Sequence, residues 1–433
     1  MKLAVIFESS PFDRKGLFNA VHNRVKYLLA TGECIIDVFC VHSRDNAFTR
    51  RVRHTPEVPS VDETVVDGIR YRLLWYRFSI LDNVLLEKLH VRPWLFRRFM
   101  ESHVDLLKGY DAVIAHSFCG GLFALAAHER FGIPYYVTWH GSDVHTHPWR
   151  VPVILEDTRA VMESARCNFF VSRALLDASE KIISNARKEV LYNGVSEDFV
   201  KYSPEDRAAV RERYGLAPED KVVAFVGNIV KVKNVLSLPE IFAKVAKGYD
   251  GPLKFWIIGD GKLRKPLEAT MDLSFRPNDH SLSFRPNEVS GEISFFGNQP
   301  SPAMPDIMNC IDVLVLPSLN EGLPLVCAEA LRCGAAVVGS DVGGIAEVIG
   351  KDNVVPLVVP NDTDTFPGFP SGPLICTGQE MGNSGRPYDD SFVNGMTEKV
   401  VAALTGQSPF QTLPADISWA RTAALELSIL KSL

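Results

Sequence analysis

The sequence is poor in the features that mark special classes of protein. Its eight cysteines form no Cys-x-x-Cys pair and no regular framework, which favours reduced thiols in a cytoplasmic protein. No apolar run approaches the roughly 18 residues that a membrane-spanning helix needs. The formal net charge is only −6, which argues against nucleic acid as the main partner.

What is present describes an ordinary globular protein of two domains. Hydrophobic residues make up 46% and charged residues 23% of the 433 positions, as in soluble globular proteins. A chain of this length exceeds one ordinary core. The opening "MKLAVIFESSP" has a short apolar run followed by Glu8, and we interpret it as a buried strand and not as a signal peptide.

Apolar runs of strand length alternate with helical patterns along the chain. Near-continuous apolar strands separated by helices predict parallel sheets covered on both faces. Two series of such runs predict two doubly wound, Rossmann-like α/β domains, with ligands at the carboxyl ends of the strands. The first series occupies 3–7, 34–41, 111–116, 135–140 and 168–172, and the second 222–227, 255–259, 293–297, 313–317 and 336–340.

The polar stretch 202–221 separates the two series. We therefore predict an N-terminal domain over residues 1–205, a C-terminal domain over residues 206–415 and an amphipathic helix over residues 416–433. Two further segments have the character of inserted surface loops. Residues 273–287 contain "LSFRPN" twice, and residues 361–390 are rich in Pro, Gly and Asp.

Two glutamates flank a predicted loop-to-helix junction in "NEGLPLVCAEALRCG", residues 320–334. Glu321 lies in the loop and Glu329 on the second helical turn, with Pro324 in the first turn, where its missing N–H costs nothing. A helix start favours a phosphate or another anion. The free N–H groups there belong to Gly322, Leu323 and Leu325. The residues alone leave open a metal site, a glycosidic bond to cut or a sugar nucleotide to hold.

The same stretch resembles the E-x7-E motif of retaining glycosyltransferases, and residues 321–349 resemble glycosyltransferase family 4 along their whole length. Other family motifs occur in the family's order. "WHGSD" (139–143) resembles H-G-S-D, and "LYNGVSEDF" (191–199) is similar to P-N-G-V-D. "FVGNIVKVKNV" (225–235) resembles V-G-R-x-x-x-x-K, and "WIIGDGKLRKPLE" (256–268) resembles I-x-G-x-G-x-x-x-x-x-L-E. The resemblance covers nearly the whole chain outside the two insertions.

This resemblance implies a GT-B fold, in which two Rossmann-like domains face each other across a cleft and the C-terminal helix crosses back to the first domain. It implies that Glu329 bonds the ribose hydroxyls of a donor nucleotide and that Glu321, as a catalytic residue, lies beside the transferred sugar. Lys233 matches the family lysine that neutralises the diphosphate. The other donor-binding residues that it implies are Gly227, Asn228, Gly322, Leu323, Pro324 and Leu325.

One position departs from the family pattern. Asn228 stands where the family has an arginine directly after the glycine, and an amide supplies no charge. Lys231 lies two residues before Lys233 and can compensate if the segment is extended, because residues two apart then share a face.

The resemblance places His140 near the transferred sugar, as a second catalytic residue. Acceptor contacts are expected from the first turn after the first strand, at Gly16 and Asn19 with Lys15 and His22, and from His116 and Ser117 after a later strand.

His140 also belongs to a group of polar residues that includes His145, His147 and Asp143. These side chains are possible metal ligands, but they lack the spacing of a zinc motif such as H-E-x-x-H. We expect no metal here, and the family needs none.

We therefore expect a retaining glycosyltransferase that moves a sugar from a nucleotide diphosphate sugar, UDP- or GDP-linked, to a saccharide or lipid-linked saccharide. The donor is a substrate, and no cofactor is expected. Alternatives are a glycoside hydrolase, which also uses two carboxylates, a nucleotide-sugar epimerase, or a non-catalytic sugar-nucleotide-binding protein.

Residues 70–98 combine seven basic and two acidic residues with aromatic and aliphatic side chains. Such a mixture can lie on an anionic membrane surface, and it is also typical of a strand and helix packed on a core. Peripheral contact with the inner face of a membrane is therefore one expectation for this segment.

Overall fold

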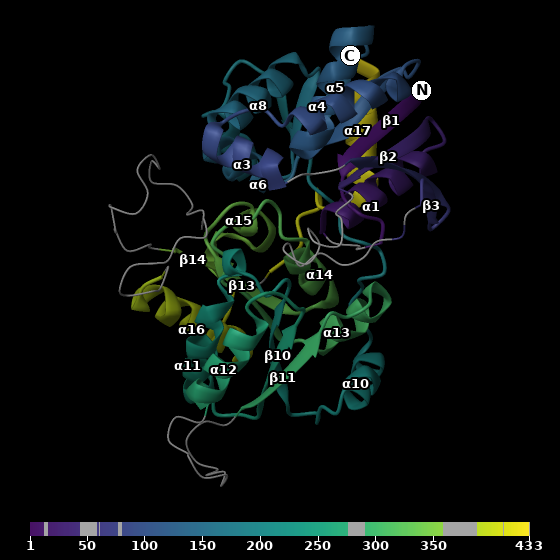
Figure 1. Ribbon diagram of the computed structural model, residues 1–433. Helices are drawn as coiled ribbons and strands as arrows, with labels where there is room; N and C mark the ends of the chain where they lie inside the picture. Colours follow the sequence, from purple (N-terminus) through teal and green to yellow (C-terminus); the bar gives the residue numbers. More distant parts are fainter. Residues whose placement is uncertain are drawn as a thin grey trace. The chain divides into compact units, whose positions relative to one another are not determined.

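The computed structural model describes residues 1–12, 16–43, 59, 61–76, 80–275, 291–357, 388–409 and 411–432 (Figure 1). The chain forms two compact units: unit 1 contains Met1–Gly194 and Ser418–Leu433, and unit 2 contains Val195–Ile417. The sequence-based boundary after residue 205 falls inside a helix of unit 2, α10 (Pro204–Arg213). The chain enters unit 2 earlier because Asn309 already bonds the backbone of Val200 and Tyr202, at 2.9 Å each.

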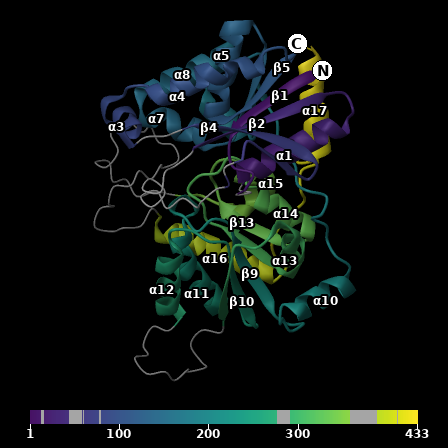
Figure 2. The same ribbon diagram turned by 45° about the vertical axis from the view of Figure 1, so that its right-hand side comes forward.

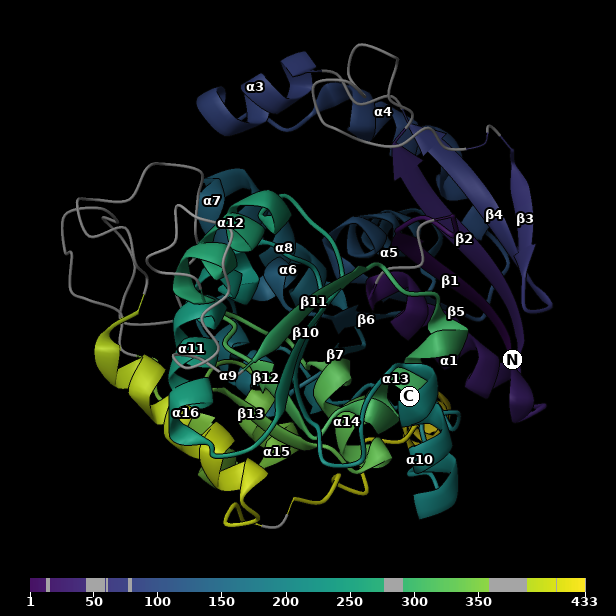
Figure 3. The ribbon, with the colours of Figure 1, turned by 90° about the horizontal axis from the view of Figure 1, so that it is seen from below.

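Unit 1 is built on an eight-stranded sheet with the order β3-β4-β2-β1-β5-β6-β7-β8. All neighbours are parallel except the hairpin of β3 and β4, and Figure 3 shows β3, β4, β2, β1 and β5 in this order. The strands are β1 (Lys2–Glu8), β2 (Ile35–Ser43), β3 (Glu63–Val66), β4 (Ile69–Tyr76), β5 (Ala112–His116), β6 (Tyr135–Trp139), β7 (Cys167–Phe170) and β8 (Lys188–Val190).

The order of this sheet reverses between β1 and β5. The connections on the two sides of such a switch point run in opposite directions, so right-handed crossovers put α1 (Gly16–Ala30) and α5 (Ser117–Phe131) on opposite faces. The apolar run of β1 is thus covered on both sides, and its residues from Leu3 to Phe7 are at most 1% exposed. Further helices among the described residues of this unit are α3 (Ile80–Leu89), α4 (Trp94–His103), α6 (Ser142–His145), α7 (His147–Arg150), α8 (Pro152–Ser164) and α9 (Arg173–Ser179).

The last helix, α17 (Trp419–Ser432), returns to unit 1 and packs on α1, as the resemblance implied (Figures 1 and 2). Its first residue approaches the backbone so closely that a Cβ on Gly194 would lie 2.0 Å from the amide nitrogen of Trp419. Deeper in the contact, Arg24 of α1 and Glu426 of α17 form an ion pair of 2.8 Å in which the two side chains are 1% and 0% exposed.

Unit 2 is a six-stranded parallel sheet with the order β11-β10-β9-β12-β13-β14. Its strands are β9 (Lys221–Val226), β10 (Leu253–Ile258), β11 (Glu292–Gly297), β12 (Val313–Leu316), β13 (Ala336–Ser340) and β14 (Val354–Val355). Its helices, besides α10, are α11 (Leu238–Gly248), α12 (Arg264–Phe275), α13 (Met304–Cys310), α14 (Leu325–Cys333), α15 (Ile345–Ile349) and α16 (Asp390–Leu404). The order again reverses once, between β9 and β12, which predicts a ligand site at the carboxyl ends of these two strands.

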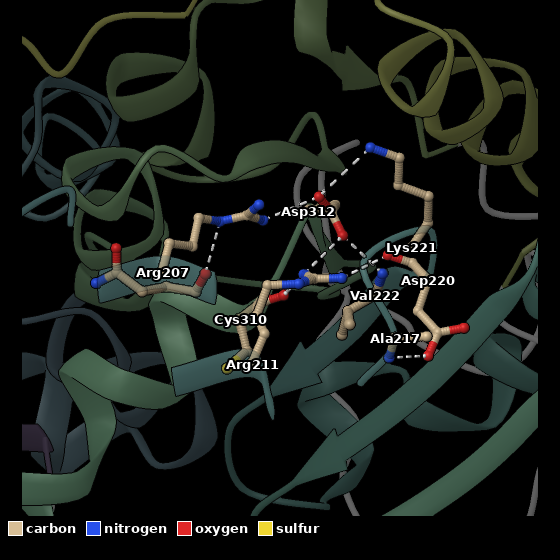
Figure 4. A network of polar contacts seen from close by, with 9 residues as sticks. Arg207, Arg211, Ala217, Asp220, Lys221, Val222, Cys310 and Asp312 are labelled. Atoms are coloured by element: carbon tan, nitrogen blue, oxygen red, sulfur yellow. Dashed lines mark hydrogen bonds and ion pairs between the residues drawn. The ribbon is translucent and has the colours of Figure 1, made fainter. Parts of the chain in front are cut away.

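The opposite, amino-terminal edge of this sheet is held by Asp312 (Figure 4). Its carboxylate pairs with Arg207 at 3.0 Å, Arg211 at 3.3 Å and Lys221 at 3.8 Å. It also accepts a hydrogen bond of 2.8 Å from the amide of Val222. Both arginines lie on α10, so this network fastens α10 to the first residues of β9 and β12.

Of the two predicted insertions, residues 276–287 and 361–387 lie outside the described residues. Residues 273–275 end α12, and Asp389 caps α16 by accepting a hydrogen bond of 3.0 Å from the amide of Phe392.

Candidate functional site

In unit 2 the predicted site residues gather at the switch point of the sheet. Gly227, Asn228 and Lys233 follow β9, whereas residues 321–325 follow β12 and lead into α14. The two segments touch through their backbones, because the amide of Leu319 donates a hydrogen bond of 2.8 Å to the carbonyl of Val232. The parallel sheet thus brings together residues about ninety positions apart in the sequence.

Glycines let the loops at this edge approach each other closely. A Cβ on Gly259 would lie 2.0 Å from the carbonyl oxygen of Gly227, and one on Gly261 would lie 2.3 Å from that of Ile229. Gly343, at a φ of +51°, would place a Cβ 1.8 Å from the carbonyl oxygen of Glu321. The turn at 343 therefore packs directly on the first glutamate of the motif.

Lys233 and Glu321 form an ion pair at the centre of this edge. The Lys233 ammonium lies 2.5 Å from Oε1 of Glu321, and the two side chains are 21% and 9% exposed. Ser318 donates a hydrogen bond of 2.7 Å to the same carboxylate oxygen. The glutamate is thereby fixed from two sides, and the ammonium is held beside the start of α14.

The helix start itself differs slightly from the sequence-based expectation. Pro324 is the residue before the helix, in an extended conformation, and α14 begins at Leu325. No side chain caps this end, so backbone N–H groups of the first turn remain available to an anion. Gly322 faces the glycine turn, where its carbonyl accepts a hydrogen bond of 3.1 Å from the amide of Gly344.

Glu329 lies on the second turn of α14, half-buried. Burial raises the pKa of its carboxyl from 4.5 to about 7. We find no hydrogen bond or ion pair to this carboxyl from any residue that the structure describes. A recessed carboxyl with open hydrogen-bonding capacity can accept hydrogen bonds from ligand hydroxyl groups.

The segment around Asn228 also departs from expectation. The Asn228 side chain is exposed. Lys231 to Lys233 form a 3-10 turn, not an extended segment, and side chains two residues apart in such a turn point about 120° away from each other around its axis. The idea that Lys231 shares a face with Lys233 is therefore wrong for this structure.

In unit 1, His116 and His140 meet at the carboxyl ends of β5 and β6. Nδ1 of His116 lies 3.1 Å from Nε2 of His140. Asp143 secures the following turn by accepting hydrogen bonds from the amides of His140, at 3.1 Å, and Gly141, at 2.8 Å. Asp143 therefore has a structural role in the turn.

Burial favours the neutral form of both histidines. The pKa of His140 is lowered to about 3, mainly by burial and secondly by the charge of Arg24. The same two causes hold the pKa of His116 well below its usual value. A neutral imidazole donates one hydrogen bond and accepts one, so each ring keeps one nitrogen for a further partner.

The other predicted acceptor residues lie at the start of α1. Gly16 is its exposed first residue. Asn19 is half-buried one turn later, and its carbonyl accepts a hydrogen bond of 3.0 Å from the Asn23 side chain. Lys15 lies outside the described residues. His22 bonds Tyr71 across 2.6 Å and pairs with Asp67 at 3.1 Å, so it is part of the core contact between α1 and the sheet.

Sequence reasoning missed several residues of these sites. Ser318 and Gly343 support Glu321, and Arg24 lies buried close enough to the histidine pair to lower both pKa values. The position of Ser318 after a predicted parallel strand could have indicated its role. No local pattern in the sequence indicated the role of Arg24, because its partner lies on α17.

Within the described ranges, no group of three or more His, Cys, Asp or Glu side chains is arranged to hold a metal ion. No helix in the described part of the chain is long and apolar enough to cross a membrane.

Comparison with known proteins relates the chain to one family. Residues 26–194 match the family described as "Glycosyl transferase 4-like domain", and residues 220–367 match "Glycosyl transferases group 1". Together the two matches cover more than half of the chain.

Two curated relatives are similar over part of their length. The chain is 28% identical over 242 residues to the putative teichuronic acid biosynthesis glycosyltransferase TuaC of Bacillus subtilis, which covers 56% of either protein. It is 28% identical over 248 residues to N-acetyl-alpha-D-glucosaminyl L-malate synthase of Bacillus anthracis, covering 57% of this chain and 59% of that protein. The chain thus spans little more than half the length of the curated relatives that it matches.

Among solved structures, sucrose-phosphate synthase from Thermosynechococcus elongatus is similar over 100% of this chain and 94% of its own, with a TM-score of 0.63 at 16% identity. This likeness concerns the fold, a two-domain GT-B architecture. The chain therefore belongs to glycosyltransferase family 4.

Proposed function

We propose that the protein is a retaining glycosyltransferase that moves a sugar from a nucleotide diphosphate sugar to a hydroxyl group of a saccharide or lipid-linked saccharide. The proposed setting is the synthesis of a cell-surface polysaccharide or glycoconjugate. Its relatives TuaC and the N-acetylglucosaminyl malate synthase are named for transfer or synthesis reactions. The names of these two relatives favour neither an epimerase nor a hydrolase.

One observation carries the donor assignment. At the switch point of unit 2, the ion pair with Glu321 holds the Lys233 ammonium at the loop that leads into α14. That loop ends in an uncapped helix start, and the second turn of the helix carries Glu329, a recessed carboxyl without a polar partner among the described residues. A nucleoside diphosphate sugar has matching parts: a diphosphate for Lys233 and the helix start, and ribose hydroxyl groups for Glu329. The charge that grows on the departing diphosphate is stabilised best by groups already in place.

Glu321 and His140 are the proposed catalytic residues. Glu321 keeps Lys233 in position and offers its remaining carboxylate oxygen to hydroxyl groups of the transferred sugar. His140 uses Nε2 for His116, which leaves Nδ1 for the sugar. Because its pKa is about 3, His140 acts as a neutral hydrogen-bonding group at physiological pH and not as a general acid.

The test is a thermal-shift screen of the full chain with UDP-, GDP- and ADP-sugars in the presence of EDTA. We expect stabilisation by UDP- or GDP-sugars without a divalent metal. Glu329→Ala should abolish the shift, whereas Glu212→Ala, on an exposed face of α10, should leave it intact. Lys233→Met should weaken binding of UDP far more than binding of uridine. Absence of a shift with every nucleotide would refute the donor assignment.

We also propose that residues 70–98 contact an anionic membrane surface. Leu89, Val91 and Trp94 in this segment are 64%, 50% and 61% exposed, and the Arg98 guanidinium lies 5.5 Å from the centre of the Trp94 ring. Exposed apolar side chains next to arginines suit the interface of an anionic bilayer.

Sedimentation with vesicles at low salt tests this contact. We expect the protein to bind vesicles that contain anionic lipid and not purely zwitterionic ones. Val91→Ser combined with Trp94→Ser should reduce binding, whereas Val65→Ser, a change at a 63% exposed valine of β3, should not. Equal binding of all variants, or none to anionic vesicles, would remove this proposal.

A further inference from the structure

Unit 1 contains a large cavity that the donor assignment does not use. Its volume is about 950 Å³, at the upper end of the range of about 300–1,000 Å³ that is usual for small-molecule sites. Residues from the ends of β1 and β4 and from α3, α4, α5, α6, α7 and α8 line it. Figures 1 and 2 show α4, α5 and α8 side by side on this part of unit 1.

About half of the side chains that line the cavity are apolar. The apolar lining residues include Phe96 and Met100 of α4, Leu122 of α5, and Val153 and Ile154 of α8. Helix α4 is amphipathic, yet none of its residues is fully buried. Its apolar face is therefore only partly covered by the protein, and the uncovered part borders the cavity.

One end of the cavity is polar and belongs to the predicted acceptor site. Ser117 follows directly on His116, and Asp143 anchors the turn of His140. Glu8, at the carboxyl end of β1, accepts a hydrogen bond of 2.7 Å from Tyr76. An acceptor hydroxyl held at this end would lie at the switch point between β1 and β5.

Four arginines and five carboxylates line the cavity, so the lining has no excess of positive charge. Arg92 pairs with Asp157 at 2.9 Å, and Arg97 pairs with Glu101 at 3.0 Å. The walls therefore do not call for a strongly anionic ligand. Hydroxyl groups of a plain saccharide would lack partners where they lie against the apolar side chains, which is costly. An uncharged apolar chain would gain from burial against the same side chains.

We propose that this cavity binds the apolar chain of an amphiphilic acceptor, with the acceptor hydroxyl at the polar end beside His116 and Ser117. The inference rests on the proposed transferase function, and it narrows the acceptor to molecules with an aliphatic or isoprenoid-like portion. The wall formed by α4 then has two roles, since the same helix carries the exposed Trp94 of the proposed membrane contact.

Calorimetric titration with a homologous series of alkyl β-D-glucosides tests the proposal. The probes are methyl, butyl, hexyl and octyl glucoside, each below its micellar concentration, with the full chain. Burial of one methylene group contributes enough to raise affinity about fourfold, so affinity should climb steeply from methyl to octyl glucoside. Equal affinity across the series would overturn the proposal.

A variant that fills the cavity provides the specific control. The variant Ala126→Phe places a large side chain in the part of the lining that α5 contributes. The control variant Ala209→Phe makes the same change at an exposed position of α10. We expect Ala126→Phe to lower octyl glucoside affinity at least tenfold and Ala209→Phe to leave it unchanged. Leu122→Gln, which makes the wall polar without enlarging the side chain, should act in the same direction if Ala126→Phe does not fold.

The donor shift separates failure of this inference from failure of the proposed function. Stabilisation by a UDP- or GDP-sugar together with a flat alkyl series would refute the apolar acceptor alone. A steep alkyl series without any nucleotide shift would refute the transferase assignment and, with it, the role of the cavity as an acceptor site.

Discussion

Removal of the charge of Glu426 should weaken the contact between α17 and α1 and lower the stability of unit 1. Glu426→Gln keeps the shape of the side chain but leaves the Arg24 guanidinium unpaired at 1% exposure. Burial raises the pKa of Glu426 and lowers that of Arg24, and their attraction opposes both shifts. Removal of one partner from a buried ion pair costs about 3–5 kcal/mol, because the other charge remains desolvated.

Calorimetric unfolding of the full chain measures this cost. A loss of this size should lower the melting temperature of unit 1 by roughly 10 °C. A matched control is Glu33→Gln, which removes the exposed ion pair between Glu33 and Lys431 of the same helix. Exposed pairs contribute at most about 1 kcal/mol, so this control should hardly shift the transition. The double variant Arg24→Met with Glu426→Leu should recover most of the lost stability.

The result that would refute this reasoning is a Glu426→Gln variant no less stable than Glu33→Gln. The pKa of His140 provides a second readout. It is lowered mainly by burial and, to a smaller extent, by the charge of Arg24. In the double variant without that charge, NMR titration should find the His140 pKa raised toward its ordinary value of about 6.5. Burial, the first cause, remains, so the shift should be incomplete.

Two further predictions concern unit 2. Because the pKa of Glu329 is raised to about 7, UDP affinity measured by calorimetry should increase from about pH 6 to about pH 8 as the carboxyl ionises, and Glu329→Gln should remove this dependence. The same shift should lower the free energy of unfolding as pH rises from about 4.5 to about 7, since the native carboxyl retains a proton that the unfolded one releases. Asp312→Asn should destabilise unit 2 by about 3 kcal/mol in urea unfolding without changing UDP affinity, because Asp312 lies at the edge of the sheet opposite to the site.

The parallel sheets were the most predictable part of the fold. A run such as 222–227 is apolar at almost every position because it is buried on both faces, and this pattern is local in the sequence. The hairpin of β3 and β4 was missed, although Asp67-Gly68 is a strong turn signal, and both residues have a positive φ. The short strand β8, with its polar Lys188 and Glu189, carried too little pattern to be found.

The unpredictable features depend on contacts between distant segments. The buried partner of Arg24 lies four hundred residues later, on α17. The cavity borders the incompletely covered face of α4. A helix with the same apolar stripe would look identical in sequence if it were fully buried. Even the site was only half predictable. Parallel-strand order places the residues at one edge, but it does not reveal that Lys233 pairs with Glu321.

That ion pair distinguishes among the possible roles of the two glutamates. A glycoside hydrolase needs both carboxyls to face the scissile bond, but one oxygen of Glu321 is already held by Lys233 and Ser318. A metal site would draw the carboxylates together around the ion, whereas the ammonium of Lys233 already neutralises one of them. Glu329, whose carboxyl has no polar partner among the described residues, has the unfilled hydrogen-bonding capacity. These contacts favour the proposed division of roles, in which Glu321 positions the Lys233 cation for an anionic ligand and Glu329 accepts hydrogen bonds from ligand hydroxyl groups.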